Sequence, residues 1–136
     1  MINVYETEDG VVFDMSQLEC DALRSYADGL LTDPEHPFVE LLRGQGLVVG
    51  DTPVPHLAAL LQAFSQATKV LTAWVVAPAG CRRSTFFVGP HSAAVLRCDD
   101  GGLYAGEDDP LTVWSIDAEQ LRDTFFELSA IGEPSG

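Results

Sequence analysis

Residues 68–116 read TKVLTAWVVA, PAGCRR, STFFV, GPH, SAAVLRC, DDGG, LYA, GEDDP and LTVWSI, and this stretch decides the fold. β-Branched and aromatic residues fill the longer runs, whereas Gly, Pro and Asp fill the gaps between them. That distribution is typical of short strands joined by tight turns. The sequence therefore predicts a sheet in this region, covered by the helical stretches on either side.

The first of these runs is apolar on both of its faces. Alternation along a strand places Val70, Thr72, Trp74 and Val76 on one face, with the residues between them on the other. A strand that is apolar on both sides is usually buried on both sides. We therefore expect a central strand here, with a hairpin turn at 99–102 further along the sheet.

The N-terminal third combines a hairpin with a capped helix. Residues 2–6 and 11–14 alternate between apolar and polar, and an Asp-Gly pair lies between them, which predicts a β-hairpin. Ser16 precedes Glu19 by three residues, which is the spacing of a capping box, so a helix is expected over 16–28.

Three further helices are predicted from their starting residues. Pro37 and Pro55 each suit the first position of a helix, because a proline lacks the N–H that would be unpaired there. Asp117 and Gln120 have capping-box spacing before the last apolar stripe. Residues 1–136 are thus predicted to form a single α+β domain. Its antiparallel sheet of four or five strands is packed with three N-terminal helices and one C-terminal helix.

Charge limits the partners that this chain would favour. It has 21 acidic and 7 basic residues, for a net charge of −14. A negative field of that size repels nucleic acid and anionic lipid, and favours solubility or a basic partner. No apolar run reaches the ~20 residues that span a bilayer, and the N-terminus resembles no signal peptide. We expect a cytoplasmic protein without membrane insertion or nucleic-acid binding.

The sequence contains no recognisable catalytic, cofactor-binding or metal-binding motif. The cysteines and histidines lack the close spacing of zinc ligands or of a helical metal pair. The acidic turns at 99–100 and 107–109 lack the residue order of a calcium loop, although they could chelate that ion. Cys81 lies beside two arginines that would favour a thiolate, but an incidental surface thiol is the simpler interpretation. The sequence therefore predicts a non-enzymatic protein with no cofactor.

Aromatic residues supply the candidate interface. Neighbours such as Phe86 and Phe87 point to opposite faces of a regular strand, so one of each pair is exposed, covered by another element, or buried in a partner. The candidate interface residues are Trp74, Phe86, Phe87, Trp114 and Phe126.

The order of elements resembles one half of the EspG family, which is associated with ESX (type VII) secretion. The matching segments are DMSQLECDALRSYADG, HPFVELLRGQGLV, PHLAALLQAF, TKVLTAWVV, STFFVG, SAAVLRCDDG and LTVWSIDAEQLRDTFFEL, within residues 14–130. Members of the family are cytoplasmic chaperones with two related halves of mixed helix and sheet, which hold a secreted PE–PPE substrate pair. Because this chain has about half their length, the resemblance implies that it pairs with a copy of itself as a homodimer, or does something else. It supplies no substrate-contact residue.

The expected function is therefore a protein-binding module, a secretion-associated chaperone or adaptor acting as a homodimer on a protein partner. Two alternatives remain open at this point. One is a small enzyme, which a cleft with convergent His and carboxylate groups would favour. The other is an acidic inhibitor or DNA mimic of a nucleic-acid-binding protein, which a strip of carboxylates at phosphate-like spacing would favour.

Overall fold

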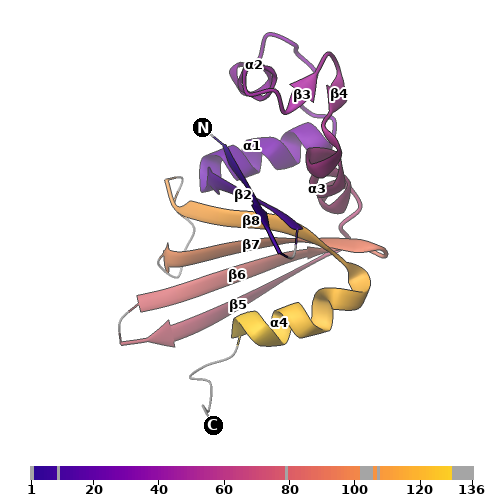
Figure 1. Ribbon diagram of the computed structural model, residues 1–136. Coiled ribbons are helices and arrows are strands. Elements are labelled where there is room, and N and C mark those ends of the chain that lie inside the picture. The colour runs from indigo at the N-terminus through magenta and orange to yellow at the C-terminus, as the bar shows by residue number, and fades with distance from the viewer. Residues whose placement is uncertain (1, 9, 79, 102–105, 107, 130–136) are drawn as a thin grey trace.

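A six-stranded antiparallel sheet forms the middle layer of the molecule, with helices on both faces (Figure 1). The structure is a computed structural model that describes residues 2–8, 10–78, 80–101, 106 and 108–129. The strand order is β1-β2-β8-β7-β6-β5. The strands are β1 (Asn3–Thr7), β2 (Gly10–Ser16), β5 (Lys69–Ala77), β6 (Gly80–Val88), β7 (Ser92–Gly101) and β8 (Pro110–Asp117).

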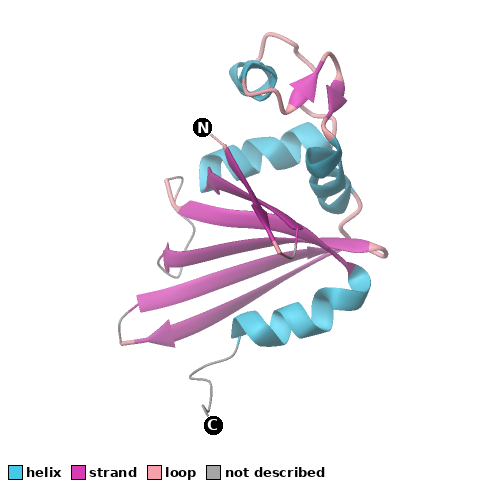
Figure 2. Cartoon of the chain, viewed as in Figure 1, coloured by secondary structure: helices cyan, strands magenta, loops and turns pink. Residues whose placement is uncertain are grey.

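The helices divide between the two faces of this sheet. Figure 2 shows α1 (Gln17–Ala27) and α3 (Pro55–Ser65) on one face and α4 (Leu121–Ser129) on the other. Helix α2 (Pro37–Gly44) lies beyond α1 and α3, beside a small ladder formed by β3 (Val48–Val49) and β4 (Thr52–Pro53). The α+β class, the antiparallel sheet and the four helices are confirmed for the described residues. The main sheet has six strands, not four or five, because the N-terminal hairpin joins it through β2.

Local sequence signals set the ends of the helices. Ser16 Oγ accepts the Glu19 N–H at 3.1 Å, and the Glu19 carboxylate accepts the Ser16 N–H at 2.9 Å, so the predicted capping box is formed. After α1, Gly29 has a φ of 76°, and the N–H of Leu30 bonds the Ser25 carbonyl at 2.9 Å. This is the Schellman pattern, which satisfies carbonyls that the helix leaves unpaired. Pro37 and Pro55 begin α2 and α3, as predicted.

The C-terminal helix begins with a tighter turn than the sequence suggests. Asp117 and Gln120 form a capping box, but the residues that it starts, Ala118–Gln120, are a 3₁₀-helix (η1). Helix α4 follows directly from it. A short 3₁₀ turn is common at the N-terminus of an α-helix, and the capping pattern does not distinguish the two.

Two sequence predictions about the sheet are wrong. Residues 99–101 continue β7 instead of forming a turn, and Gly102 lies outside the described residues. Strand β5 is not central but ends the sheet next to β6. Its position follows from the chain order, because β5 to β8 form a meander whose last strand pairs with β2. The apolar residues on β5 therefore have no strand beyond them.

Adjacent phenylalanines of β6 serve two separate cores. Phe87 is buried on the face covered by α1 and α3, where its ring lies 5.4 Å from that of Phe64 in an edge-to-face arrangement. Phe86 is fully buried on the opposite face, with its ring 5.4 Å from that of Phe125 in α4. The sheet thus separates a large hydrophobic core on one face from a smaller core on the other.

Removal of either buried ring should destabilise the fold strongly. We expect Phe86→Ala and Phe87→Ala each to lower the free energy of unfolding by about 3–5 kcal/mol, because a cavity replaces a buried ring. Phe126→Ala is the matched control, since that side chain is 61% exposed. It should cost less than about 1 kcal/mol. Urea denaturation followed by circular dichroism measures all three, and equal losses for Phe86 and Phe126 would contradict the two-core description.

Candidate functional site

Strand β5 presents the most unusual surface of the molecule. We call its outer side, residues Lys69–Ala77, the β5 edge. The exposed fractions along it are 56% for Val70, 43% for Leu71, 48% for Trp74 and 64% for Val76. The end strand of a sheet offers a row of backbone N–H and C=O groups to another chain. A long and largely apolar edge of this kind is a ready template for strand pairing.

The opposite edge of the same sheet is built differently. Strand β1 has five residues against nine in β5, and its sequence NVYET includes Glu6. Glu8 follows directly and is exposed. Short length and charge are the usual means by which proteins protect a sheet edge from another strand. Of the two edges of the main sheet, β5 is the longer, and Lys69 at its start is its one charged residue.

The β5 edge does not share the strong negative charge of the whole chain. Strands β5 and β6 contain Lys69, Arg82 and Arg83, and none of the 21 acidic residues. Both arginines have partners, since Arg82 lies 3.6 Å from Asp99 and Arg83 lies 3.2 Å from Asp109. The β5 edge is therefore close to neutral, in a protein with a net charge of −14.

A recess adjoins this edge on the α1 face of the sheet. Its volume is about 290 Å³, and Trp74, Thr72 and Thr85 line it together with Arg24 of α1. The Arg24 guanidinium lies 4.3 Å from the centre of the Phe87 ring, a cation–π distance that helps to hold it there. The recess offers space beside Trp74 for a side chain of a bound strand.

The five predicted interface residues fall into three groups. Phe86 and Phe87 are buried in the two cores, so other elements of the chain cover both rings. Trp114 is half-buried in the smaller core. Trp74 on the β5 edge and Phe126 on α4 are exposed. Of the exposed apolar residues of β5, Trp74 is the one that the sequence predicts as an interface residue. The other three are not predicted, because a central strand would have buried them.

A second cavity lies between α4 and the sheet. Its volume is about 720 Å³, and its lining includes Trp114, Arg97, His56, Asp123 and Glu127. In the described residues no hydrogen bond joins His56 to either carboxylate. General-base or nucleophilic catalysis needs a base that a partner group orients. The cavity therefore holds the residue types of an enzyme site without the contacts between them.

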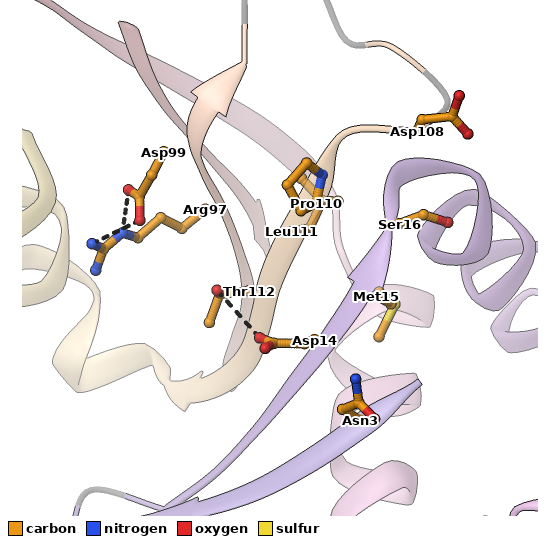
Figure 3. A pocket seen from close by; sticks show the side chains of 10 residues that line it. All are labelled: Asn3, Asp14, Met15, Ser16, Arg97, Asp99, Asp108, Pro110, Leu111 and Thr112. Carbon is orange, nitrogen blue, oxygen red and sulfur yellow. Dashed lines mark hydrogen bonds and ion pairs between the residues drawn. The ribbon is translucent and has the colours of Figure 1, made fainter. Parts of the chain in front are cut away.

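Figure 3 shows a pocket that is lined by one aspartate from each of the two acidic segments, Asp99 and Asp108. Asp99 accepts two bonds from Arg97, at 2.8 and 3.1 Å, and Asp14 accepts one from Thr112 at 3.4 Å. Asp108 points away from both in the figure. Among the described residues no group of three acidic, His or Cys side chains is placed to hold a metal ion, and Asp100 and Glu107 are outside the described side chains.

Asp109 ties the loop before β8 to two other elements. Its carboxylate accepts the Gly106 N–H at 2.9 Å and the Arg83 guanidinium at 3.2 Å, and its carbonyl accepts the Gln17 N–H at 2.9 Å. The Gly106 bond first, and then Arg83, hold the pKa of Asp109 below its usual value of 3.8. The carboxylate thus remains charged and bonded in mild acid.

The three cysteines differ in access. Cys20 and Cys98 are buried, whereas Cys81 is partly exposed at the start of β6. Burial raises the pKa of the Cys20 thiol to about 12. Cys20 is therefore a protonated core residue at neutral pH, and not a nucleophile.

Comparison with known proteins gives no relative for this chain. No protein-family model, no curated protein and no solved structure matches it. In the residues that the structure describes, no helix has the length and apolar character to cross a bilayer.

The environment of Asp109 predicts a specific pH dependence. A group whose pKa falls on folding stabilises the fold above its unfolded pKa, and this contribution is lost as the pH falls through the folded pKa. We expect Asp109→Asn to lower the free energy of unfolding at pH 7, and the deficit to shrink only below about pH 3.8. Urea titrations of both proteins between pH 7 and pH 2.5 measure this. A deficit that is constant over the whole range would contradict the assignment.

Thiol labelling should separate the cysteines. In the folded protein we expect one thiol, Cys81, to react quickly with Ellman's reagent at pH 8, because the other two are buried. The Cys81→Ser variant should show no fast reaction until it is unfolded in guanidinium, when two thiols appear. Fast labelling of folded Cys81→Ser would show that the core around Cys20 or Cys98 opens.

Proposed function

We propose that this protein is a non-enzymatic protein-binding module that binds an extended segment of a partner protein along the β5 edge. One observation carries the proposal: a nine-residue end strand with four exposed apolar side chains and no acidic residue. Strand addition of this kind gives affinity through main-chain hydrogen bonds and specificity through pockets for alternate side chains. The β5 edge offers the first, and the recess beside Trp74 offers the second.

The arrangement of side chains supports this mechanism. Because directly opposed residues share a face, Val70, Trp74 and Val76 lie on the face of the sheet that α1 covers, and Leu71 lies on the α4 face. A bound strand would bury apolar side chains on both faces of the extended sheet. A sheet that is extended in this way also removes the unpaired backbone groups of β5 from water.

A more specific proposal follows from the resemblance to the EspG family. In that case the module acts in the cytoplasm as a homodimeric chaperone or adaptor for a secreted substrate. The support is the order of helices and strands in this chain, which resembles that of one half of the family. The acidic surface would serve solubility and steer basic regions of a client.

Selection from a peptide library tests strand addition. A phage-displayed library of nine-residue peptides is selected on sparsely immobilised protein, so that neighbouring copies do not meet. We expect peptides with alternating apolar residues to be enriched, because they match the period of a strand. Their binding should fall at least about 30-fold for the double variant Val70→Glu/Val76→Glu, which buries carboxylates against the added strand.

The matched control adds the same charge away from β5. Val4→Glu/Leu18→Glu substitutes two residues that are 44% and 54% exposed, on β1 and α1. It should bind the selected peptides as the unmodified protein does. Peptides that bind equally to all three proteins, or that are lost only with the control, would overturn the proposal.

A further inference from the structure

We infer that the segment held by the β5 edge is β5 of a second copy of this chain, paired antiparallel about a twofold axis at Ala73. This inference rests on the proposed function, since it names the partner for the same edge. The result is a dimer in which two six-stranded sheets become one continuous sheet. Three features of the described residues favour this occupant over a different protein.

The first feature is the self-complementary sequence of β5. With Ala73 opposite itself, Val70 faces the partner subunit's Val76, and Leu71 faces the partner subunit's Val75. Thr72 faces the partner subunit's Trp74, and Lys69 faces the partner subunit's Ala77. Residues that lie directly opposite each other in an antiparallel pair share one face of the sheet. A twofold axis perpendicular to the sheet meets this requirement, because it places the α1 faces of both subunits on the same side of the combined sheet. Each residue of the strand then has an opposite residue, and the two most exposed of its large hydrophobic residues, Val70 and Val76, lie opposite each other.

The second feature is charge. Two copies with a net charge of −14 repel one another over most of their surfaces. Strand β5 and its neighbour β6 have no carboxylate, and Arg82 and Arg83 already have carboxylate partners. A basic segment would find no counter-charge on the strand itself, and an acidic one would find only Lys69. A largely apolar strand without acidic residues fits best, and β5 is such a strand.

The third feature is the way the assembly ends. An edge that pairs with itself about a twofold axis uses the same surface on both subunits, so the contact closes on itself. The free edges of the dimer are then two copies of β1, which is short and includes Glu6. These edges resist further strand addition. The geometry therefore predicts a dimer and not a fibre.

The salt dependence of this dimer distinguishes it from binding of a basic partner. Between about 0.05 and 0.5 M NaCl the Debye length falls from roughly 14 Å to roughly 4 Å. Repulsion between two acidic subunits is screened over that range, so the dimer should become tighter. We expect its dissociation constant to fall at least about fivefold. Attraction between this chain and a basic segment would weaken instead.

The experiment uses the full chain and measures mass by light scattering after gel filtration, with sedimentation equilibrium at both salt concentrations. We expect a dimer. Val70→Glu/Val76→Glu places like charges opposite each other at both ends of the ladder, and should weaken the dimer at least about 100-fold. Val70→Lys/Val76→Glu places opposite charges there, and should restore the dimer to within about tenfold of the unmodified chain. Val4→Glu/Leu18→Glu should leave it unchanged.

Several outcomes would overturn the inference. They are a monomer at both salt concentrations, a dimer that survives Val70→Glu/Val76→Glu, and a dimer that Val70→Lys/Val76→Glu does not restore. Circular dichroism and urea denaturation confirm that each variant is folded, which the exposure of Val70 and Val76 favours. A monomer that still binds selected peptides at β5 would leave the proposed function standing and remove the second copy as its partner. A monomer that binds no such peptide would remove both.

Discussion

The architecture depends on one long-range contact, the antiparallel pairing of β2 with β8. It joins Phe13 to Val113 and Asp14 to Thr112, residues that are close to opposite ends of the chain. The contact adds the N-terminal hairpin to the meander of β5 to β8, and it makes β1 one edge of the sheet and β5 the other. It also carries α1, which follows β2 directly, onto the face that Phe87 and Leu96 line. Without it, β8 would end the sheet and α1 would not be held against this apolar face.

The two faces of this sheet are covered to different extents, and that difference explains the exposed surface. Helices α1 and α3 lie over the middle strands on one face, and α4 lies over the other face. Helix α4 contacts β5 on its own face, whereas on the α1 face Val76 of β5 remains 64% exposed. A single exposed apolar residue is common on a protein surface. Four of them on one end strand form a row along the strand, spaced by the two-residue period of its side chains on each face. That pattern is what strand addition requires, and the mixed cavity beside α4 shows no comparable arrangement.

Much of the local structure could be predicted from the sequence, because local rules decide it. The Ser16 capping box, the helix starts at Pro37 and Pro55, and the N-terminal hairpin all depend on residues within a few positions of one another. The position of β5 could not be predicted, because an apolar strand looks the same whether the chain itself or a partner covers it. The sequence predicts Phe86 and Phe87 as interface candidates for the same reason. It shows that the two side chains point in opposite directions, but it does not show that α4 covers Phe86 and that α1 and α3 cover Phe87. Of the five candidate interface residues, Trp74 and Phe126 are exposed in the structure. In the described residues no hydrogen bond joins His56 to the carboxylates of the cavity beside α4, a spatial relation that the order of residues cannot predict.

The pairing of β2 with β8 also has a consequence for synthesis on the ribosome. Asp14 leaves the exit tunnel long before Thr112, its partner in the sheet, has been made. Throughout that interval the hairpin and α1 have no sheet to complete, while β5, β6 and β7 emerge and begin to pair. A nascent meander of these three strands has two unpaired edges, β5 and β7. The β7 edge stays unpaired until β8 adds to it and β2 in turn pairs with β8. Domains with such non-local pairing fold slowly, and their unpaired strands are exposed to other chains meanwhile. The last β-strand of this protein is thus the one that ends the vulnerable period of its biosynthesis.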